Sequence, residues 1–171
     1  MAEYKYAFQG FNKELMAWAV IRDGNVSTKQ GIEISNYLRH RKLTQAKALL
    51  ALVLEKKQAI PFKRFMNGLG HKPGMSSGRY PIKASETFLK LLESVEANAQ
   101  SKGLNTGELE IIHICTHKAA NQSHYGRAAG RHFKKSHIEV VVQETPKKEK
   151  GKKEEKKTEN IKQDPSKKKK E

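Results

Sequence analysis

The sequence predicts an α+β fold: three helices packed on a small antiparallel three-stranded sheet, with a long protruding β-hairpin and a disordered basic tail. Three segments repeat apolar residues at the three- and four-residue spacing of a helix, and three shorter runs are rich in strand-forming residues. For a chain of 171 residues, one compact domain over residues 1–144 is expected, followed by the tail over residues 145–171.

The predicted elements follow one another as strand, three helices and two strands. The strand-like runs are residues 16–22, 109–115 and 138–143. The helices are expected to begin at N-cap residues, namely Ser27, Thr44 and Ser85. Gln30 would complete a capping box with the first of these residues. The aromatic side chains of residues 1–12 are expected to pack on the core, with stacking on nucleic-acid bases as the alternative.

The segment between the last two strands, residues 116–137, is expected to form the protruding hairpin. It is much longer than a tight turn requires, and its small residues could not bury a core. It holds four histidines, no acid and five cations, which are Lys118, Arg127, Arg131, Lys134 and Lys135. A slim basic arm without carboxylates is suited to threading among phosphates. A disordered surface loop is the alternative interpretation.

A second basic segment without acids runs over residues 60–83. Its three prolines and four glycines are expected to prevent regular structure through most of its length. The cations in it are Lys63, Arg64, Lys72, Arg79 and Lys83. Loops of this length inside a compact domain are uncommon unless they are functional.

The net charge of the chain is +16, and it is unevenly distributed. The tail contains twelve lysines and six acids, so it contributes +6 and leaves +10 on residues 1–144. A basic body indicates a polyanionic partner, whereas a tail with almost no apolar residues is expected to be disordered. No apolar run approaches the roughly 20 residues that a membrane-spanning helix needs.

No catalytic, cofactor or metal site is predicted. The alternation of His113, Cys115 and His117 would place them on one strand face, with Ile112, Ile114 and Thr116 on the other. This spacing is not a recognised zinc motif, and no second cluster offers the remaining ligands. As the only cysteine, Cys115 excludes an intramolecular disulfide and is expected to be a buried, inert thiol.

Four segments carry a resemblance to a known family. They are Gly70-His71-Lys72-Pro73-Gly74 with Gly78-Arg79-Tyr80-Pro81, Asn98-Ala99 with Lys102-Gly103-Leu104, Arg127-Ala128-Ala129-Gly130-Arg131, and His137-Ile138-Glu139-Val140-Val141-Val142. With these motifs in order, residues 6–144 resemble the universal large-subunit ribosomal protein family numbered twenty-two in the bacterial series, in its archaeal and eukaryotic branch.

The resemblance implies a structural, non-enzymatic constituent of the large ribosomal subunit, located on cytoplasmic ribosomes. It implies binding to large-subunit rRNA, neighbouring ribosomal proteins as partners, and a hairpin that reaches the wall of the polypeptide exit tunnel. The nascent polypeptide would pass near the hairpin tip.

The predicted RNA-binding residues come from both acid-free segments. They are Lys63, Arg64, His71, Lys72, Arg79, Tyr80, Lys83, Lys118, Arg127, Arg131, Lys134 and Lys135. The three arginines at 79, 127 and 131 are expected to be the strongest contacts, because a planar guanidinium binds phosphate in two-pronged fashion or stacks on a base.

Two other functions remain open from the residues alone. A DNA-binding helix-turn-helix protein could use residues 27–40 and 44–57, although the second helix offers little polar chemistry for base edges. An enzyme acting on RNA is disfavoured, because the basic segments lack the paired carboxylates that would hold Mg²⁺.

Overall fold

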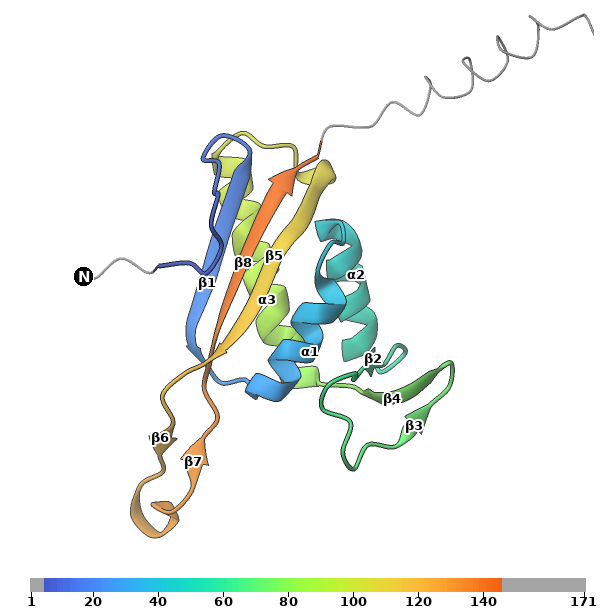
Figure 1. Cartoon of the computed structure of the whole chain (residues 1–171), viewed down its shortest axis with the longest axis vertical. Coiled ribbons are helices and arrows are strands. Elements are labelled where there is room, and N and C mark those ends of the chain that lie inside the picture. Colours follow the sequence, from blue (N-terminus) through green and yellow to red (C-terminus); the bar gives the residue numbers. More distant parts are fainter. Residues whose placement is uncertain (1–4, 146–171) are drawn as a thin grey trace, which may run out of the picture.

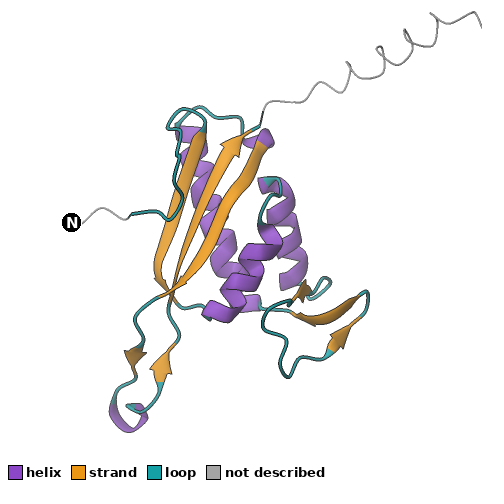
Figure 2. Cartoon of the chain, in the orientation of Figure 1, coloured by secondary structure: helices purple, strands orange, loops and turns teal. Residues whose placement is uncertain are grey.

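A computed structural model describes residues 5–145 of the chain, so the predicted tail lies outside the described residues apart from Thr145. Three antiparallel strands form the main sheet in the order β1-β8-β5 (Figure 1). Their bounds are β1 Met16–Gly24, β5 Leu109–Lys118 and β8 Ser136–Glu144. Three helices cover one face, with bounds α1 Thr28–Leu38, α2 Leu43–Leu54 and α3 Ile82–Ser101 (Figure 2). The predicted α+β fold is confirmed.

The central strand β8 is buried on both faces. Ile138, Val140 and Val142 point into the core between sheet and helices, where Phe88 of α3 and Ile34 of α1 are fully buried. The opposite face of the sheet is covered by aromatic side chains near the N-terminus, which therefore pack on the sheet and not, as predicted, on the core. The Trp18 ring lies 3.7 Å from the Phe11 ring and 5.4 Å from the Tyr6 ring, centroid to centroid.

A β-bulge corrects the predicted alternation in β5. Ile111 pairs with Val142, but His113 pairs with the adjacent Val141, so one residue of β5 is left over. The bulge places Ile111 rather than Ile112 in the core with Ile114, because the phase of the alternation changes between positions 111 and 113.

Two of the three predicted helix starts are wrong. Ser27 does occupy the N-cap of α1, although its side chain makes no capping hydrogen bond. α2 begins earlier, at Leu43, a fully buried residue that fixes its first turn against the core. α3 begins at Ile82, because the Ser85 N–H donates to the Pro81 carbonyl at 2.9 Å and closes a turn before the predicted cap.

The segment over residues 60–83 has more regular structure than predicted. It contains a small sheet in the order β2-β4-β3, with bounds β2 Ile60–Pro61, β3 His71–Lys72 and β4 Met75–Arg79. Its glycines permit this structure. Gly74 adopts φ +72° between β3 and β4, and a Cβ on Gly78 would lie 2.7 Å from the Met75 sulfur.

Helix α1 approaches β5 closely enough to require glycine. A Cβ on Gly31 would lie 2.6 Å from the Thr116 Cγ2. One helical turn further on, the Ser35 and Thr116 hydroxyls form a buried hydrogen bond of 2.9 Å. The small residue and the hydroxyl pair together fix the distance between α1 and the sheet.

Gly31→Ala is expected to lower the free energy of unfolding by about 1–3 kcal/mol, because the added methyl overpacks the contact with Thr116. Urea unfolding measures the change. Adding Thr116→Ser should restore part of the loss, since it removes the clashing methyl and keeps the hydroxyl. Gly70→Ala is the matched control, because a Cβ there meets nothing within 4 Å. Equal stability of Gly31→Ala and Gly70→Ala would refute the close-packing account.

Candidate nucleic-acid interface

A buried carboxylate on α1 holds the beginning of the basic loop. Glu33 is only 2% exposed, and it accepts the backbone N–H groups of Lys63, Arg64 and Phe65 at 3.1, 2.7 and 2.9 Å. Hydrogen bonds from N–H groups to an ionised carboxylate are among the stronger ones in proteins. Glu33 therefore fixes the loop backbone while the Lys63 and Arg64 side chains remain exposed.

The N-terminal end of the same helix is tied to the base of the hairpin. Ser136, the first residue of β8, is fully buried, and its hydroxyl donates to the Val26 carbonyl at 2.9 Å. The Thr28 hydroxyl lies 3.0 Å from the Ser136 hydroxyl. Helix α1 thus positions both acid-free segments, one at Glu33 and the other at Ser136.

The two segments meet in a hollow of about 490 Å³, here called the basic cleft. The loop contributes Arg64, Arg79 and Lys83, and the hairpin contributes Lys134. Its full lining is Asn25, Ser27, Lys29, Gln30, Phe62, Arg64, Phe65, Asn67, Arg79, Lys83 and Lys134. No acid lines this cleft, so its cations are available to an anionic partner.

A neighbouring hollow of about 390 Å³ continues the basic surface toward the hairpin. It shares Lys29 and Lys134 with the basic cleft, and it adds Lys118 and Lys135 from the two sides of the hairpin base. The two hollows form one cationic surface that extends from β4 to the hairpin.

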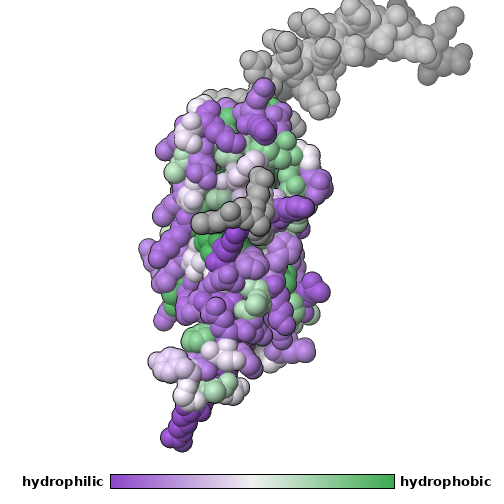
Figure 3. Space-filling model, turned by 90° about the vertical axis from the view of Figure 1, so that its left-hand side faces the viewer, coloured by the Kyte–Doolittle hydropathy of each residue, from purple (hydrophilic) through white to green (hydrophobic). Residues whose placement is uncertain are grey.

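Beyond its base, the hairpin is an arm that projects from the body (Figure 1). Short strands pair within it, β6 Gln122–Ser123 with β7 His132–Phe133. The His124 ring stacks on the Phe133 ring at 3.6 Å, and a 3₁₀ turn, η2 Gly126–Ala128, closes the tip. In side view the arm is the narrow lower end of a largely hydrophilic surface (Figure 3).

The tip of this arm displays aromatic and guanidinium groups. Tyr125 is 90% exposed, and Arg127 within the turn and Arg131 after it are also exposed. The His124 N–H donates to the Arg131 carbonyl at 2.9 Å, which holds the two sides together. The protruding hairpin predicted from the sequence is present, and its tip contains a short strand pair and a 3₁₀ turn.

The predicted RNA-binding residues fall into separate groups. The residues that line the basic cleft or the neighbouring hollow are Arg64, Arg79, Lys83, Lys118, Lys134 and Lys135. Arg127 and Arg131 lie at the arm tip. His71, Lys72 and Tyr80 lie on or beside the small sheet, where the Lys72 ammonium sits 5.3 Å from the Tyr80 ring centroid. Lys63 lines another hollow, of about 320 Å³, with Arg39 and Arg41.

Sequence reasoning missed Lys29, which lines both basic hollows. A signal was available, because the first turn of α1 contains no acid and places this lysine at the positive end of the helix dipole. Its ammonium lies 5.6 Å from the Phe65 ring centroid, beside the basic loop. Arg39 and Arg41 lie outside the two acid-free segments, and their guanidinium groups donate within the protein, to the Ile114 carbonyl at 3.1 Å and to the Tyr37 carbonyl at 2.8 Å.

The helix pair α1 and α2 gives no support to the helix-turn-helix alternative. Exposed positions of α2 include Thr44, Gln45, Ala48, Ala51 and Leu52. Apart from the first two, these side chains cannot exchange hydrogen bonds with base edges.

One cluster in the described part of the chain has metal-ligating side chains, and it lies on the sheet face opposite the helices. Its members are His113, Cys115 and Glu139. Burial would raise the pKa of Glu139, but hydrogen bonds from His113, the Ala7 N–H and His117 outweigh it, so the net shift lowers this pKa. Burial and the charge of Glu139 raise the pKa of Cys115.

Comparison with known proteins identifies the family. Residues 19–143 match the family described as Ribosomal protein L22p/L17e. The chain belongs to this ribosomal protein family. Its members are structural proteins, so this chain is not an enzyme. Among the described residues, no helix is long and apolar enough to cross a membrane.

Similar proteins carry the name large ribosomal subunit protein uL22. The one from Ignicoccus hospitalis is 38% identical over 144 residues, which cover 78% of this chain and 91% of the relative. The Thermoplasma acidophilum protein is also 38% identical, over 80% of this chain and 95% of its own length. The Picrophilus torridus protein is 41% identical, over 77% of this chain and 91% of its own length.

Glu33→Gln is expected to lower the free energy of unfolding by about 1–3 kcal/mol, because an amide has a single acceptor oxygen for the three partly buried N–H groups. Urea unfolding gives the loss, and hydrogen exchange at residues 63–65 should become faster. Glu93→Gln, at an exposed position on α3, is the control and should change stability by less than about 0.5 kcal/mol. Unchanged exchange at 63–65 in Glu33→Gln would show that another contact holds the loop.

Proposed function

We propose that this structural protein of the large ribosomal subunit binds large-subunit rRNA through the basic cleft, and that its arm extends to the wall of the polypeptide exit tunnel. The observation that carries the proposal is the convergence of two acid-free segments, from distant parts of the sequence, on one cleft without a carboxylate in its lining. The protein would act in the cytoplasm as part of the ribosome.

The composition of the cleft suits an RNA backbone. Lysine and arginine side chains from α1, the loop and the hairpin surround one hollow, so a single phosphate-sugar segment could contact all three elements. Asn25, Gln30 and Asn67 add amide groups that donate to phosphate or ribose oxygens. Neutralising several phosphates at one place allows RNA segments to approach each other, which is the physical role of such a protein.

The shape of the arm supports the tunnel assignment. It is narrow, it lacks acids, and Tyr125, Arg127 and Arg131 are exposed at its tip. Arginine and tyrosine stack on unpaired bases, and a slim arm needs little space between RNA helices. At the tunnel wall, the nascent polypeptide would pass near residues 124–131. Neighbouring ribosomal proteins would contact surfaces of the body that RNA leaves uncovered.

The names of the relatives support a role in the large ribosomal subunit, because each is called a large ribosomal subunit protein. The alignments cover most of both chains, so the proposal concerns the whole folded body.

Replacing a cleft cation should reduce the salt dependence of RNA binding. For Lys134→Gln, we expect the slope of log affinity against log salt to become smaller in magnitude by about 0.7–0.9, the value of one phosphate contact. Arg79→Gln should have a similar effect. The measurement is a titration of the full chain with large-subunit rRNA at several salt concentrations, with duplex DNA as competitor.

Lys90→Gln is the matched control, since Lys90 is exposed on α3 and does not line the cleft. Its slope should equal that of the unchanged protein. Identical slopes for Lys134→Gln, Arg79→Gln and Lys90→Gln would contradict the cleft assignment, and displacement of the rRNA by equimolar duplex DNA would favour the DNA-binding alternative.

A further inference from the structure

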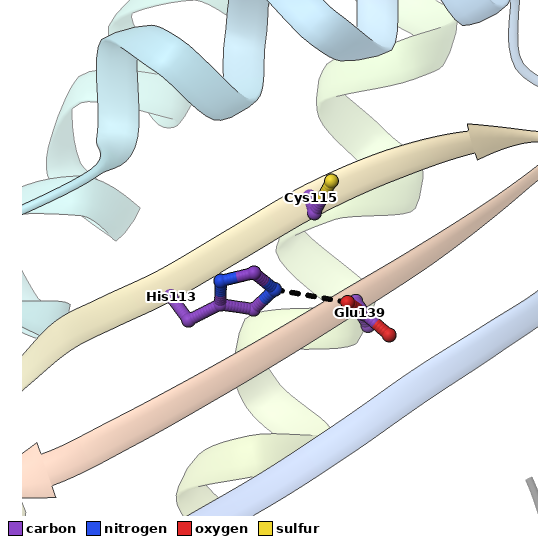
Figure 4. Close-up of side chains that lie close together, drawn as sticks. All are labelled: His113, Cys115 and Glu139. Atoms are coloured by element: carbon purple, nitrogen blue, oxygen red, sulfur yellow. Dashed lines mark hydrogen bonds and ion pairs between the residues drawn. The ribbon is translucent and has the colours of Figure 1, made fainter. Parts of the chain in front are cut away.

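The sheet face opposite the helices brings together four potential metal ligands from two strands. Cys115 of β5 pairs directly with Glu139 of β8, while His113 and His117 flank Cys115 on the same face. The Glu139 Oε1 lies 2.9 Å from the His113 Nε2 and 3.5 Å from the His117 Nε2. The ligand atoms of His113, Cys115 and Glu139 all lie within 4.8 Å of one another (Figure 4).

The surroundings hold this cluster in place. The Glu139 side chain is fully buried, and the Ala7 N–H donates to its two carboxylate oxygens at 3.2 and 3.3 Å. The Phe8 ring lies 5.5 Å from the His113 ring and covers it from the N-terminal segment. Metal-binding carboxylates are commonly oriented by such outer hydrogen bonds. The side chains of His113 and His117 are 22% and 44% exposed, which leaves a path for an ion from solvent.

We propose that His113, Cys115 and Glu139 bind a zinc ion, with His117 or a water molecule as the fourth ligand. A set of one imidazole nitrogen, one thiolate sulfur and one carboxylate oxygen matches the ligands that Zn²⁺ prefers, in tetrahedral geometry. The site is independent of the proposed RNA contacts, because it lies on the other face of the sheet from α1.

Binding requires small movements of the ligand atoms. Zinc–ligand bonds of about 2.0–2.3 Å place ligand atoms of a tetrahedral site roughly 3.3–3.8 Å apart. The ligand atoms now lie up to 4.8 Å from one another, so the most distant pair must approach by about 1 Å. The ion replaces the hydrogen bond between the His113 Nε2 and the Glu139 Oε1, so these two atoms move apart from 2.9 Å to about 3.3 Å, and the His113 ring carries its proton on Nδ1. The thiol proton of Cys115 is released to solvent as the sulfur coordinates.

The ion would join β5 to β8 close to the foot of the arm. Because Glu139 also holds the Ala7 N–H, the ion would stabilise the N-terminal segment against the sheet. The sequence alone does not show this site. Strand β5 contains only three of the four side chains, His113, Cys115 and His117, and their spacing is not a zinc motif. Glu139 becomes the central ligand only through the register of β5 against β8.

Cobalt titration of the full chain, reduced, stripped of metal with a chelator and freed of RNA, tests the site. Co²⁺ is the probe, because thiolate coordination gives it a sulfur-to-cobalt charge-transfer absorption. We expect this absorption to saturate at one equivalent per chain and to disappear when one equivalent of Zn²⁺ is added. Zn²⁺ should also raise the thermal midpoint of the chain.

Variants separate this site from adventitious binding. Cys115→Ser should abolish the charge-transfer absorption. It should also weaken zinc binding at least about 100-fold, because replacing a residue that only orients a metal ligand already weakens metal binding by up to about that factor. His113→Gln should weaken zinc binding similarly. His132→Gln, at an exposed histidine of β7, is the control and should bind zinc as the unchanged chain does.

The metal-free melts of Cys115→Ser and the unchanged chain should coincide, which shows that the variant is folded. The proposal fails if cobalt produces no charge-transfer absorption in the unchanged chain, or if zinc raises the thermal midpoint of Cys115→Ser as much as that of the unchanged chain.

Discussion

The close contact between α1 and β5 at Gly31 and Thr116 sets the geometry on which the proposed RNA surface depends. A side chain at position 31 would meet the Thr116 methyl at 2.6 Å, so the helix can lie at this depth only with glycine there. At that depth, Glu33 reaches the loop backbone and Thr28 reaches Ser136 at the foot of the hairpin. One helix therefore fixes the positions of two segments that are distant in sequence.

The placement of buried acids explains how a basic surface can remain uncompensated. Glu33 directs its carboxylate to backbone N–H groups inside the protein, and Glu139 does the same with the Ala7 N–H and two histidines. Their negative charges stabilise local structure and stay away from the cleft lining. The cations of the cleft consequently keep their full attraction for phosphate, which falls as salt concentration rises.

Much of the fold could be predicted from the sequence, because it depends on local patterns. Apolar spacing indicated the three helices, and the strand-like runs around residues 116–137 indicated the hairpin. The starts of α2 and α3 were misplaced, because buried Leu43 and the turn at Pro81 determine them more strongly than the nearby Thr44 and Ser85. The strands within residues 60–83 depend on glycines whose role appears only when the chain folds back.

The sites were harder to predict than the fold. Composition identified the cations of the two segments, but their convergence on α1 is a tertiary property. Lys29 was missed because it stands alone in the sequence, and Glu139 because strand register brings it to His113 and Cys115. In both cases the residue that completes the site comes from another element.

A density map of the large ribosomal subunit that contains this protein tests the central claim most directly. The account predicts an rRNA backbone in the basic cleft, with phosphate oxygens within hydrogen-bonding distance of both Arg79 from the loop and Lys134 from the hairpin. It also predicts the arm tip at the tunnel wall. A cleft that faces solvent, or one filled by another protein, would contradict the account.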